Sequence, residues 1–183
     1  MSAIPRLTME QLPDGLAALL RPRVERLGYL GEFFRCTANQ PDALEAFYRL
    51  TEALKATVPD RLTEVVALSV ATKLDNAYER NQHERLCVKL GYGADWVRAV
   101  ERLDPADAVL APDEQAVQRL VLGALERAGK DCLALVDAVA ERTDPQVAVG
   151  VLMLIGRYAM HATIVNALDL APPVAGIFEA AAR

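Results

Sequence analysis

The segment from Pro145 to Leu170 is almost wholly apolar, and it constrains the fold more than any other part of the sequence. As a helix it is long enough to span a bilayer. Arg157 and His161 lie near its middle, however, and neither an aromatic belt nor an asymmetric basic flank surrounds it. A helix that is apolar all round is also typical of the centre of a bundle. We therefore predict a soluble protein in which this segment is a central helix.

The rest of the sequence also favours helices packed on helices. Hydrophobic residues make up 52% of the 183 residues and aromatic residues only 5%, and few segments alternate with a period of two. Val65–Ala71 is apolar on nearly every helical face, which predicts a second central helix. The expected fold class is all-α, with helices over residues 13–27, 31–39, 42–58, 60–90, 93–103, 113–128, 131–142 and 145–168.

A chain of this length supports one hydrophobic core, so we expect a single helical domain over residues 1–183. Within it we distinguish an N-terminal arm and helix (1–30), a first half that carries the polar motif described below (31–103) and a second helical half (112–170). Residues 104–112 contain two prolines and form the one plausible hinge between the halves.

Charge and cysteine usage exclude several classes of protein. The net charge is −5 and the charges are interspersed, so we expect neither nucleic-acid nor membrane binding. The densest basic stretch, Arg21, Arg23 and Arg26, is interrupted by Glu25 and is interpreted as a solvated helix face. No signal peptide is recognisable, so we predict a cytoplasmic location. The three cysteines form neither a CxxC pair nor a zinc pattern, and we expect reduced, mostly buried thiols at Cys36, Cys87 and Cys132.

The most informative polar stretch is residues 76–83. In a helix, Asn76, Glu79 and His83 share one face, and Glu79 and His83 are one turn apart. A carboxylate beside an imidazole raises the pKa of the histidine and orients its ring, which suits a general acid or base. The structural alternative is a surface pair between Glu79 and His83.

The run from Leu62 to Gly91 resembles the core motif of carboxymuconolactone decarboxylase and alkylhydroperoxidase D-like proteins. The resemblance rests on an acidic residue that opens the helix, a Tyr-Glu pair and a histidine four or five residues later. It extends through Gly91 and Trp96, returns in the second half and covers most of the chain from about Phe33. The residues that carry it in the motif are Glu64, Tyr78, Glu79 and His83.

The resemblance implies an alkylhydroperoxidase D-like helical bundle and, in the decarboxylase branch, loss of carbon dioxide from a small carboxylated lactone without a cofactor. Such a reaction needs oxyanion stabilisation and delivery of a proton to carbon. We assign proton transfer to His83, oriented by Glu79, with Glu64 as a second acid or base in the same pocket. The candidates for substrate binding are Tyr78, Asn76 and Arg80, with Arg157 as an alternative for the substrate carboxylate.

Several alternatives stay open. In the peroxidase branch the two cysteine positions are occupied here by Asn76 and Glu79, so a thiol peroxidase of that type is disfavoured. A lone thiol at Cys87, a non-catalytic ligand-binding protein and structural roles for Glu64 and Tyr78 are the others. His161 is interpreted as a core histidine, and no metal is expected. Resemblance and apolar fraction together predict a homo-oligomer, as a dimer, trimer or hexamer.

Overall fold

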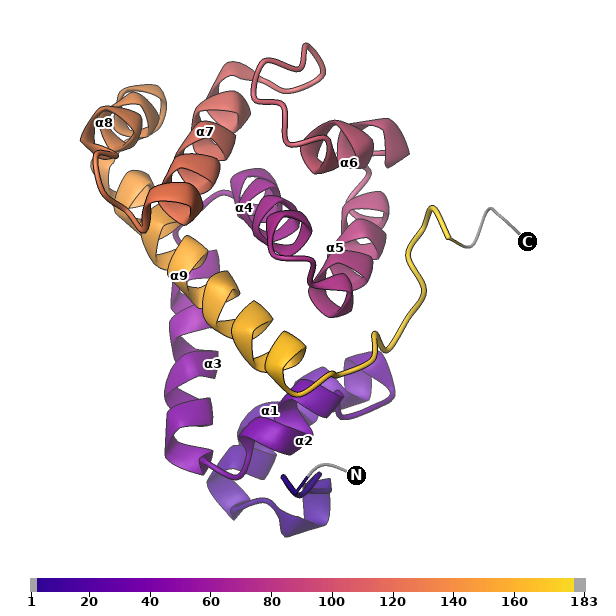
Figure 1. Ribbon diagram of the computed structural model, residues 1–183. Helices are drawn as coiled ribbons and strands as arrows, with labels where there is room; N and C mark the ends of the chain where they lie inside the picture. The colour runs from indigo at the N-terminus through magenta and orange to yellow at the C-terminus, as the bar shows by residue number, and fades with distance from the viewer. Residues whose placement is uncertain (1–2, 180–183) are drawn as a thin grey trace.

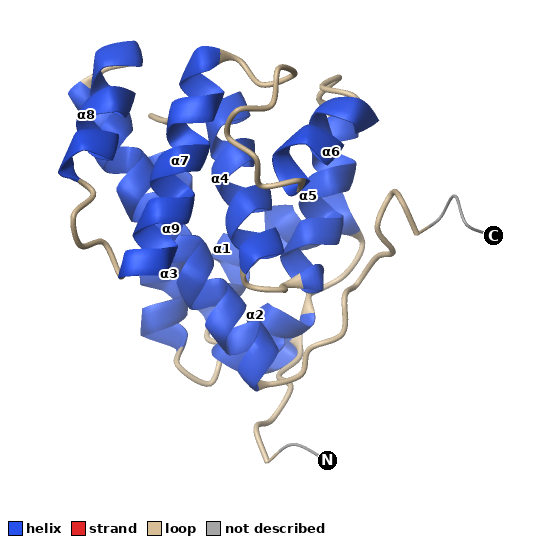
Figure 2. Cartoon of the chain, turned by 45° about the horizontal axis from the view of Figure 1, so that its top comes forward, coloured by secondary structure: helices blue, strands red, loops and turns tan. Residues whose placement is uncertain are grey.

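A computed structural model describes residues 3–179, and all its regular elements are helical within this range (Figures 1 and 2). A short 3-10 helix over Met9–Gln11 precedes nine α-helices. The predicted all-α class is therefore confirmed. The α-helices are α1 (Asp14–Leu27), α2 (Glu32–Thr37), α3 (Pro41–Lys55), α4 (Asp60–Lys73), α5 (Ala77–Lys89), α6 (Ala94–Glu101), α7 (Pro112–Arg127), α8 (Leu133–Arg142) and α9 (Pro145–Ala167).

Helix α4 is the centre of the larger hydrophobic core. Every residue from Leu62 to Ala71 is buried, because α5, α6, α7 and α9 pack around the helix. Val65, Val66 and Leu68 have no measurable exposure. Truncation of Leu68 to Ala would thus cost about 2–5 kcal/mol through lost burial and a residual cavity. The predicted central position of this segment is confirmed.

Helix α9 runs diagonally across the bundle and contacts α3, α4, α7 and α8 (Figure 1). It is the one described helix that is long and apolar enough to cross a membrane, but half of its most apolar window is buried inside the protein. Ten of its residues are buried, among them Leu154, Tyr158 and His161. Its apolar character is thus used for packing, as predicted.

The helical run predicted over residues 60–90 is interrupted. Asp75 adopts a left-handed conformation with φ of 50°, and this turn separates α4 from α5. Asn76 caps α5, because its side-chain oxygen accepts a hydrogen bond from the backbone N–H of Glu79 at 3.2 Å. The side chain of an N-cap asparagine satisfies a backbone donor that has no partner in the first turn. The prediction of one uninterrupted run was therefore wrong at this point.

The N-terminal helices form a second hydrophobic cluster. Leu16, Leu20 and Phe33 pack there with Tyr78 and with Val165 near the end of α9. The segment between the predicted halves, residues 104–112, leads into α7, which packs directly against α4. The first half thus contacts both the N-terminal helices and the second half.

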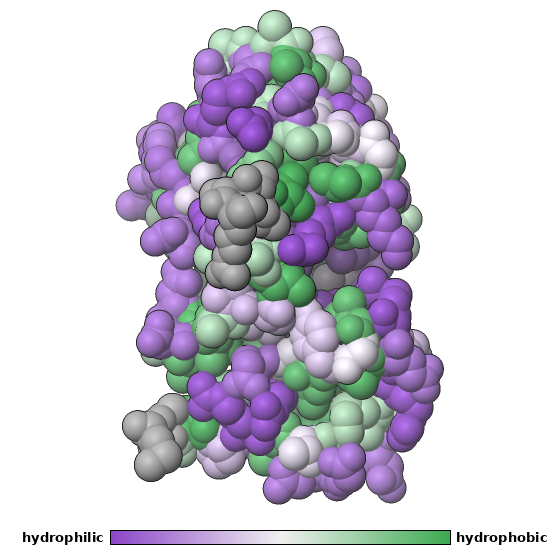
Figure 3. All heavy atoms as spheres, turned by 90° about the vertical axis from the view of Figure 1, so that its right-hand side faces the viewer, coloured by the Kyte–Doolittle hydropathy of each residue, from purple (hydrophilic) through white to green (hydrophobic). Residues whose placement is uncertain are grey.

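After α9 the chain returns along α5 (Figure 1). Side chains of α5 hold this C-terminal segment through its backbone: Asn81 donates to the carbonyl of Val174, and Arg85 donates to that of Ala175. Glu84 accepts from the amide of Ile177 at 2.6 Å. On this side of the molecule, hydrophilic and hydrophobic side chains are interspersed (Figure 3).

Candidate active site

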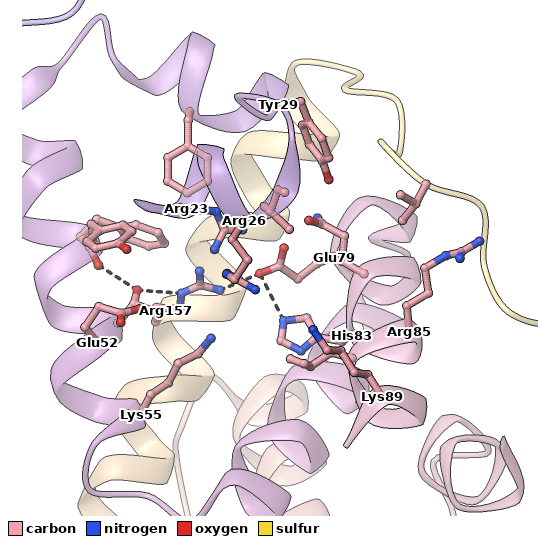
Figure 4. Close-up of a pocket in the computed structure, with 18 residues that line it drawn as sticks. Arg23, Arg26, Tyr29, Glu52, Lys55, Glu79, His83, Arg85, Lys89 and Arg157 are labelled. Atoms are coloured by element: carbon pink, nitrogen blue, oxygen red, sulfur yellow. Dashed lines mark hydrogen bonds and ion pairs between the residues drawn. The ribbon is translucent and has the colours of Figure 1, made fainter. Parts of the chain in front are cut away.

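A cavity of about 350 Å³ lies where α1, α3, α5 and α9 meet beside the C-terminal segment. Its volume suits a small organic molecule. His83 and Glu79 line it from α5, Arg157 from α9 and Lys55 from α3 (Figure 4). Helix α1 and the loop after it contribute Arg23, Arg26 and Tyr29.

Glu79 is the centre of a buried polar cluster at this cavity. Nη1 of Arg157 donates to Oε1 of Glu79 at 2.9 Å, and Nε2 of His83 lies 3.7 Å from the same oxygen. Nε2 of His161 lies 3.3 Å from the other carboxylate oxygen. Burial raises the pKa of a carboxyl group, but these partners hold the pKa of Glu79 well below its usual range. Glu79 is therefore an anion that is already paired.

His161 takes part in this cluster as a neutral residue. Its Nδ1 lies 3.3 Å from the side-chain amide nitrogen of Asn76, which can only donate. Nδ1 must then accept, so Nε2 carries the proton, and this nitrogen is the one 3.3 Å from Glu79. Burial lowers the pKa of His161 to about 4 despite the carboxylate, so the ring is neutral at neutral pH. Its ring also stacks on Phe33, with ring centroids 4.1 Å apart.

His83 has a stronger partner on its other side. Nδ1 lies 2.6 Å from Oε2 of Glu64, on the neighbouring helix α4. Burial alone would lower the pKa of His83, but Glu64 and Glu79 outweigh it and raise the pKa to about 9. The imidazole is thus a cation at neutral pH, with Nδ1 donating to Glu64. Its Nε2–H faces Glu79 and the cavity.

The three predicted catalytic residues therefore lie together, but their pairing differs from the prediction. Glu64, rather than Glu79, is the close partner of His83, and it does not line the cavity. The three predicted substrate-binding residues do not line it either. Asn76 caps α5, and the hydroxyl oxygen of Tyr78 accepts from the amide of Phe33 at 3.3 Å.

Arg80, the third of them, lies on another side of α5. Its Nε is 3.6 Å from Glu84, and both residues border a smaller hollow of about 270 Å³ with Glu101 and Phe178. The alternative that the sequence offered for a substrate carboxylate, Arg157, does line the main cavity.

Known proteins resemble this chain in structure. An uncharacterized peroxidase-related protein from Ralstonia eutropha JMP134, described as an alkylhydroperoxidase AhpD core, superposes with a TM-score of 0.79 over 94% of each chain at 16% identity. The debrominase Bmp8 superposes with a TM-score of 0.79 over 95% of this chain and 94% of its own, also at 16% identity. The chain has the alkylhydroperoxidase D-like fold. An uncharacterized peroxidase-related protein from Silicibacter sp. TM1040 agrees, with a TM-score of 0.75 over 94% of each chain at 15% identity. No family model and no curated protein matches the sequence.

Within this alkylhydroperoxidase D-like fold, the thiols of the described residues lie away from the cavity. All three cysteines are buried and free, as predicted. Sγ of Cys87 lies 3.5 Å from Glu64 and donates to it. Burial and this carboxylate raise the pKa of the Cys87 thiol far above its usual range, which disfavours the thiolate. No group of three or more metal-binding side chains occurs in the described part of the chain.

Sequence analysis missed the basic wall of the cavity. Arg23 and Arg26 were interpreted as part of a solvated face, but both line the cavity. The interpretation was wrong for Arg23, which is half-buried, whereas Arg26 is exposed. Their spacing of three residues does place them on one helix face. The position of α1 over α5 and α9 depends on tertiary packing. Periodicity alone therefore could not show that this helix face borders the cavity.

Proposed function

We propose that this chain is a cofactor-free lyase that removes carbon dioxide from a small carboxylated lactone or a related acid. The observation that carries the proposal is His83, a buried cation held by Glu64 through one nitrogen while the other faces the cavity. A general acid for carbon must hold its proton at neutral pH and present it to the substrate. His83 meets both conditions.

In the proposed reaction, the bond between the carboxylate carbon and the substrate breaks, and its electron pair moves into the conjugated system as a dienolate. The cationic groups of His83 and Arg157 would stabilise the developing oxyanion in a site largely shielded from water. Nε2–H of His83 then delivers its proton to carbon, and the imidazole regains a proton from water. Glu64 orients the ring throughout and balances its charge.

A non-catalytic ligand-binding protein is the main alternative. It would not need a buried, charged histidine at a cavity wall. Glu64, Glu79 and His83 converge here instead of pointing to solvent, which favours the enzymatic proposal. A peroxidase based on Cys87 is disfavoured because that thiol is buried and does not line the cavity.

The test is turnover of carboxymuconolactone and related carboxylated lactones by the wild type and by His83→Gln, with released carbon dioxide as the readout. We expect release by the wild type to fall at least about 100-fold in the variant, because a general acid contributes about 10²–10⁴-fold. Glu126→Gln, on the exposed side of α7, serves as a control. Equal release by the wild type and His83→Gln would contradict the proposal.

We also propose that the chain forms a homo-oligomer through α9. Val149, Met153 and Met160 are exposed on this helix and follow one another at intervals of four and seven residues, which places them on one face together with the exposed Gly156. A second copy of the same face would cover these side chains symmetrically.

A further inference from the structure

Lys55 differs from the other lysines of the chain in its surroundings. The sequence contains four lysines, and three of them, Lys73, Lys89 and Lys130, are exposed. Lys55 is the last residue of α3, is half-buried and lines the main cavity. A lysine usually keeps its amine in water, so a partly buried amine at a cavity wall calls for a reason.

A fixed cation lies over the same face of α3. Thr51 and Lys55 are one helical turn apart and therefore share this face. Nε of Arg157 donates to the hydroxyl oxygen of Thr51 at 3.1 Å, and its guanidinium carbon lies 4.9 Å from the ring centroid of Phe47, one turn earlier. Figure 4 shows Lys55 below Arg157 on this wall of the cavity. The fold thus places the amine of Lys55 next to a like charge.

No anion offsets this arrangement directly. Among the described residues, no carboxylate lies within ion-pairing distance of Lys55. Burial lowers the pKa of Lys55, and Arg157 and Arg23 lower it further, whereas Glu64 and Glu79 act in the opposite direction with a smaller effect. A lowered pKa increases the fraction of the free amine at neutral pH.

A partly desolvated lysine beside another cation is the arrangement that activates a lysine as a nucleophile, because only the free amine carries an electron pair for attack. We propose that Lys55 attacks the carbonyl carbon of a small aldehyde or ketone bound in the cavity and forms an imine with it. The volume of about 350 Å³ admits such a molecule beside the amine.

The step needs no further reactant. The electron pair of Nζ forms the C–N bond, and the π electrons of the carbonyl group move to its oxygen. Both amine protons are transferred to this oxygen, which leaves as water when the C=N bond forms. Nε2 of His83 lines the same cavity and holds a proton at neutral pH, so it can give one proton to the oxygen and regain one from the nitrogen.

This activity goes beyond the proposed lactone decarboxylation, which involves no covalent bond to the protein. A protonated imine withdraws electrons from the neighbouring carbon and so assists cleavage of a bond to that carbon. The substrates of this second activity would be small carbonyl compounds, among them keto acids.

The test is reductive trapping of the wild type with pyruvate and cyanoborohydride at neutral pH, followed by peptide mass spectrometry. Reduction of the imine adds the mass of pyruvate less one oxygen atom to the lysine. We expect this adduct to form on Lys55 at least about tenfold faster than on Lys89, because the carbonyl group is held beside the amine. Lys89 is the matched internal control, since it lines the same cavity but is exposed.

A variant and a second measurement keep the test decisive. Lys55→Arg retains the positive charge but has no amine that forms an imine, so the fast phase of labelling should disappear while Lys89 is labelled as before. Competitive acetylation of the wild type follows the titration of each lysine, and Lys55 should become reactive at lower pH than Lys89. The proposal is overturned if pyruvate labels Lys55 no faster than Lys89, or if the two lysines become reactive at the same pH.

These outcomes are separable from those of the proposed function. Trapping by pyruvate is measured without turnover, and release of carbon dioxide from the lactones is measured with His83→Gln. Fast labelling of Lys55 together with release that does not depend on His83 would refute only the lactone decarboxylase. Release that depends on His83 without fast labelling would refute only the imine.

Discussion

The carboxylate of Glu64 lies 2.6 Å from Nδ1 of His83, although the two residues belong to different helices. Glu64 is in the second turn of α4 and His83 is in the middle of α5, so their contact depends on how the two helices pack. Both side chains are buried, which strengthens the interaction between the charges. The contact gives the histidine both an orientation and a charge.

Replacement of Glu64 by Gln should therefore shift the titration of His83. The amide keeps a hydrogen-bonding group but removes the charge, so the pKa of His83 should fall from about 9 toward or below its ordinary value of 6.5. NMR titration of the imidazole measures this pKa directly. The alkaline limb of the pH dependence of turnover should move to lower pH together with the pKa. An unchanged pKa of His83 in Glu64→Gln would refute the assigned role.

The same pair makes the free energy of unfolding depend on pH. The pKa of His83 is raised in the folded state, so its stabilising contribution is complete below about pH 6.5 and is lost as the pH rises through about 9. Glu64→Gln should be less stable than the wild type by about 1–3 kcal/mol near pH 6.5. In urea unfolding, the difference in the free energy of unfolding between the wild type and Glu64→Gln should become smaller toward pH 9. A difference that grows with pH would contradict this.

Arg157 should matter for stability as well as for the site. Arg157→Met leaves the buried carboxylate of Glu79 without its 2.9 Å ion pair and removes the donor to the hydroxyl oxygen of Thr51. Loss of one partner of a buried pair costs about 3 kcal/mol. The measurement is the midpoint and slope of urea unfolding, with Arg142→Met on the exposed end of α8 as control. Equal destabilisation by the two substitutions would contradict the prediction.

Gly31 and Tyr78 should be energetically coupled. A Cβ atom at position 31 would lie 2.6 Å from the hydroxyl oxygen of Tyr78, so Gly31→Ala should cost about 1–3 kcal/mol. Tyr78→Phe removes this oxygen and with it the clash, although the amide of Phe33 loses its acceptor. We expect the double variant to be more stable than the sum of the two single effects predicts. Simple additivity in thermal unfolding would show that the two positions do not meet.

Glu101 should lower stability at alkaline pH. Burial, together with the nearby Glu84, raises the pKa of Glu101 to about 8. A carboxyl group whose pKa is raised on folding favours the folded state at low pH, and this contribution is lost as the pH rises through 8. Glu101→Gln should therefore be more stable than the wild type above pH 8, by about 1–2 kcal/mol for a half-buried group. The free energy of unfolding of both proteins is measured from pH 6 to 9, and a constant difference between them would refute this.

The proposed assembly through α9 should depend on Met153. Light scattering of the wild type should give a multiple of the 19.9 kDa chain mass. Met153→Glu should reduce it to the monomer, because a charge would have to be buried in the interface. Leu133→Glu, at an exposed position on α8, is the control and should not change the mass. A wild type that is monomeric at every concentration would refute the proposal.

The local pattern of the sequence was sufficient for the helices and for part of the site. Apolar residues on every face predicted that Val65–Ala71 and the segment from Pro145 are central, because burial is the main reason for such a pattern. The spacing of Glu79 and His83 placed them on one helix face. The absence of a CxxC pair and the burial of the cysteines could also be inferred from the sequence.

What the sequence by itself determined is therefore whatever depends on neighbours within a few residues: helix content, the central helices and the pairing of Glu79 with His83. The tertiary structure alone decided that Glu64 is the closer partner of His83, that Arg157 neutralises Glu79 and that Arg23 and Arg26 line the cavity. The physical reason is that these relationships join residues 19 and 78 positions apart, or elements with no local contact at all. Periodicity shows which residues share a helix face, whereas only packing shows what that face meets.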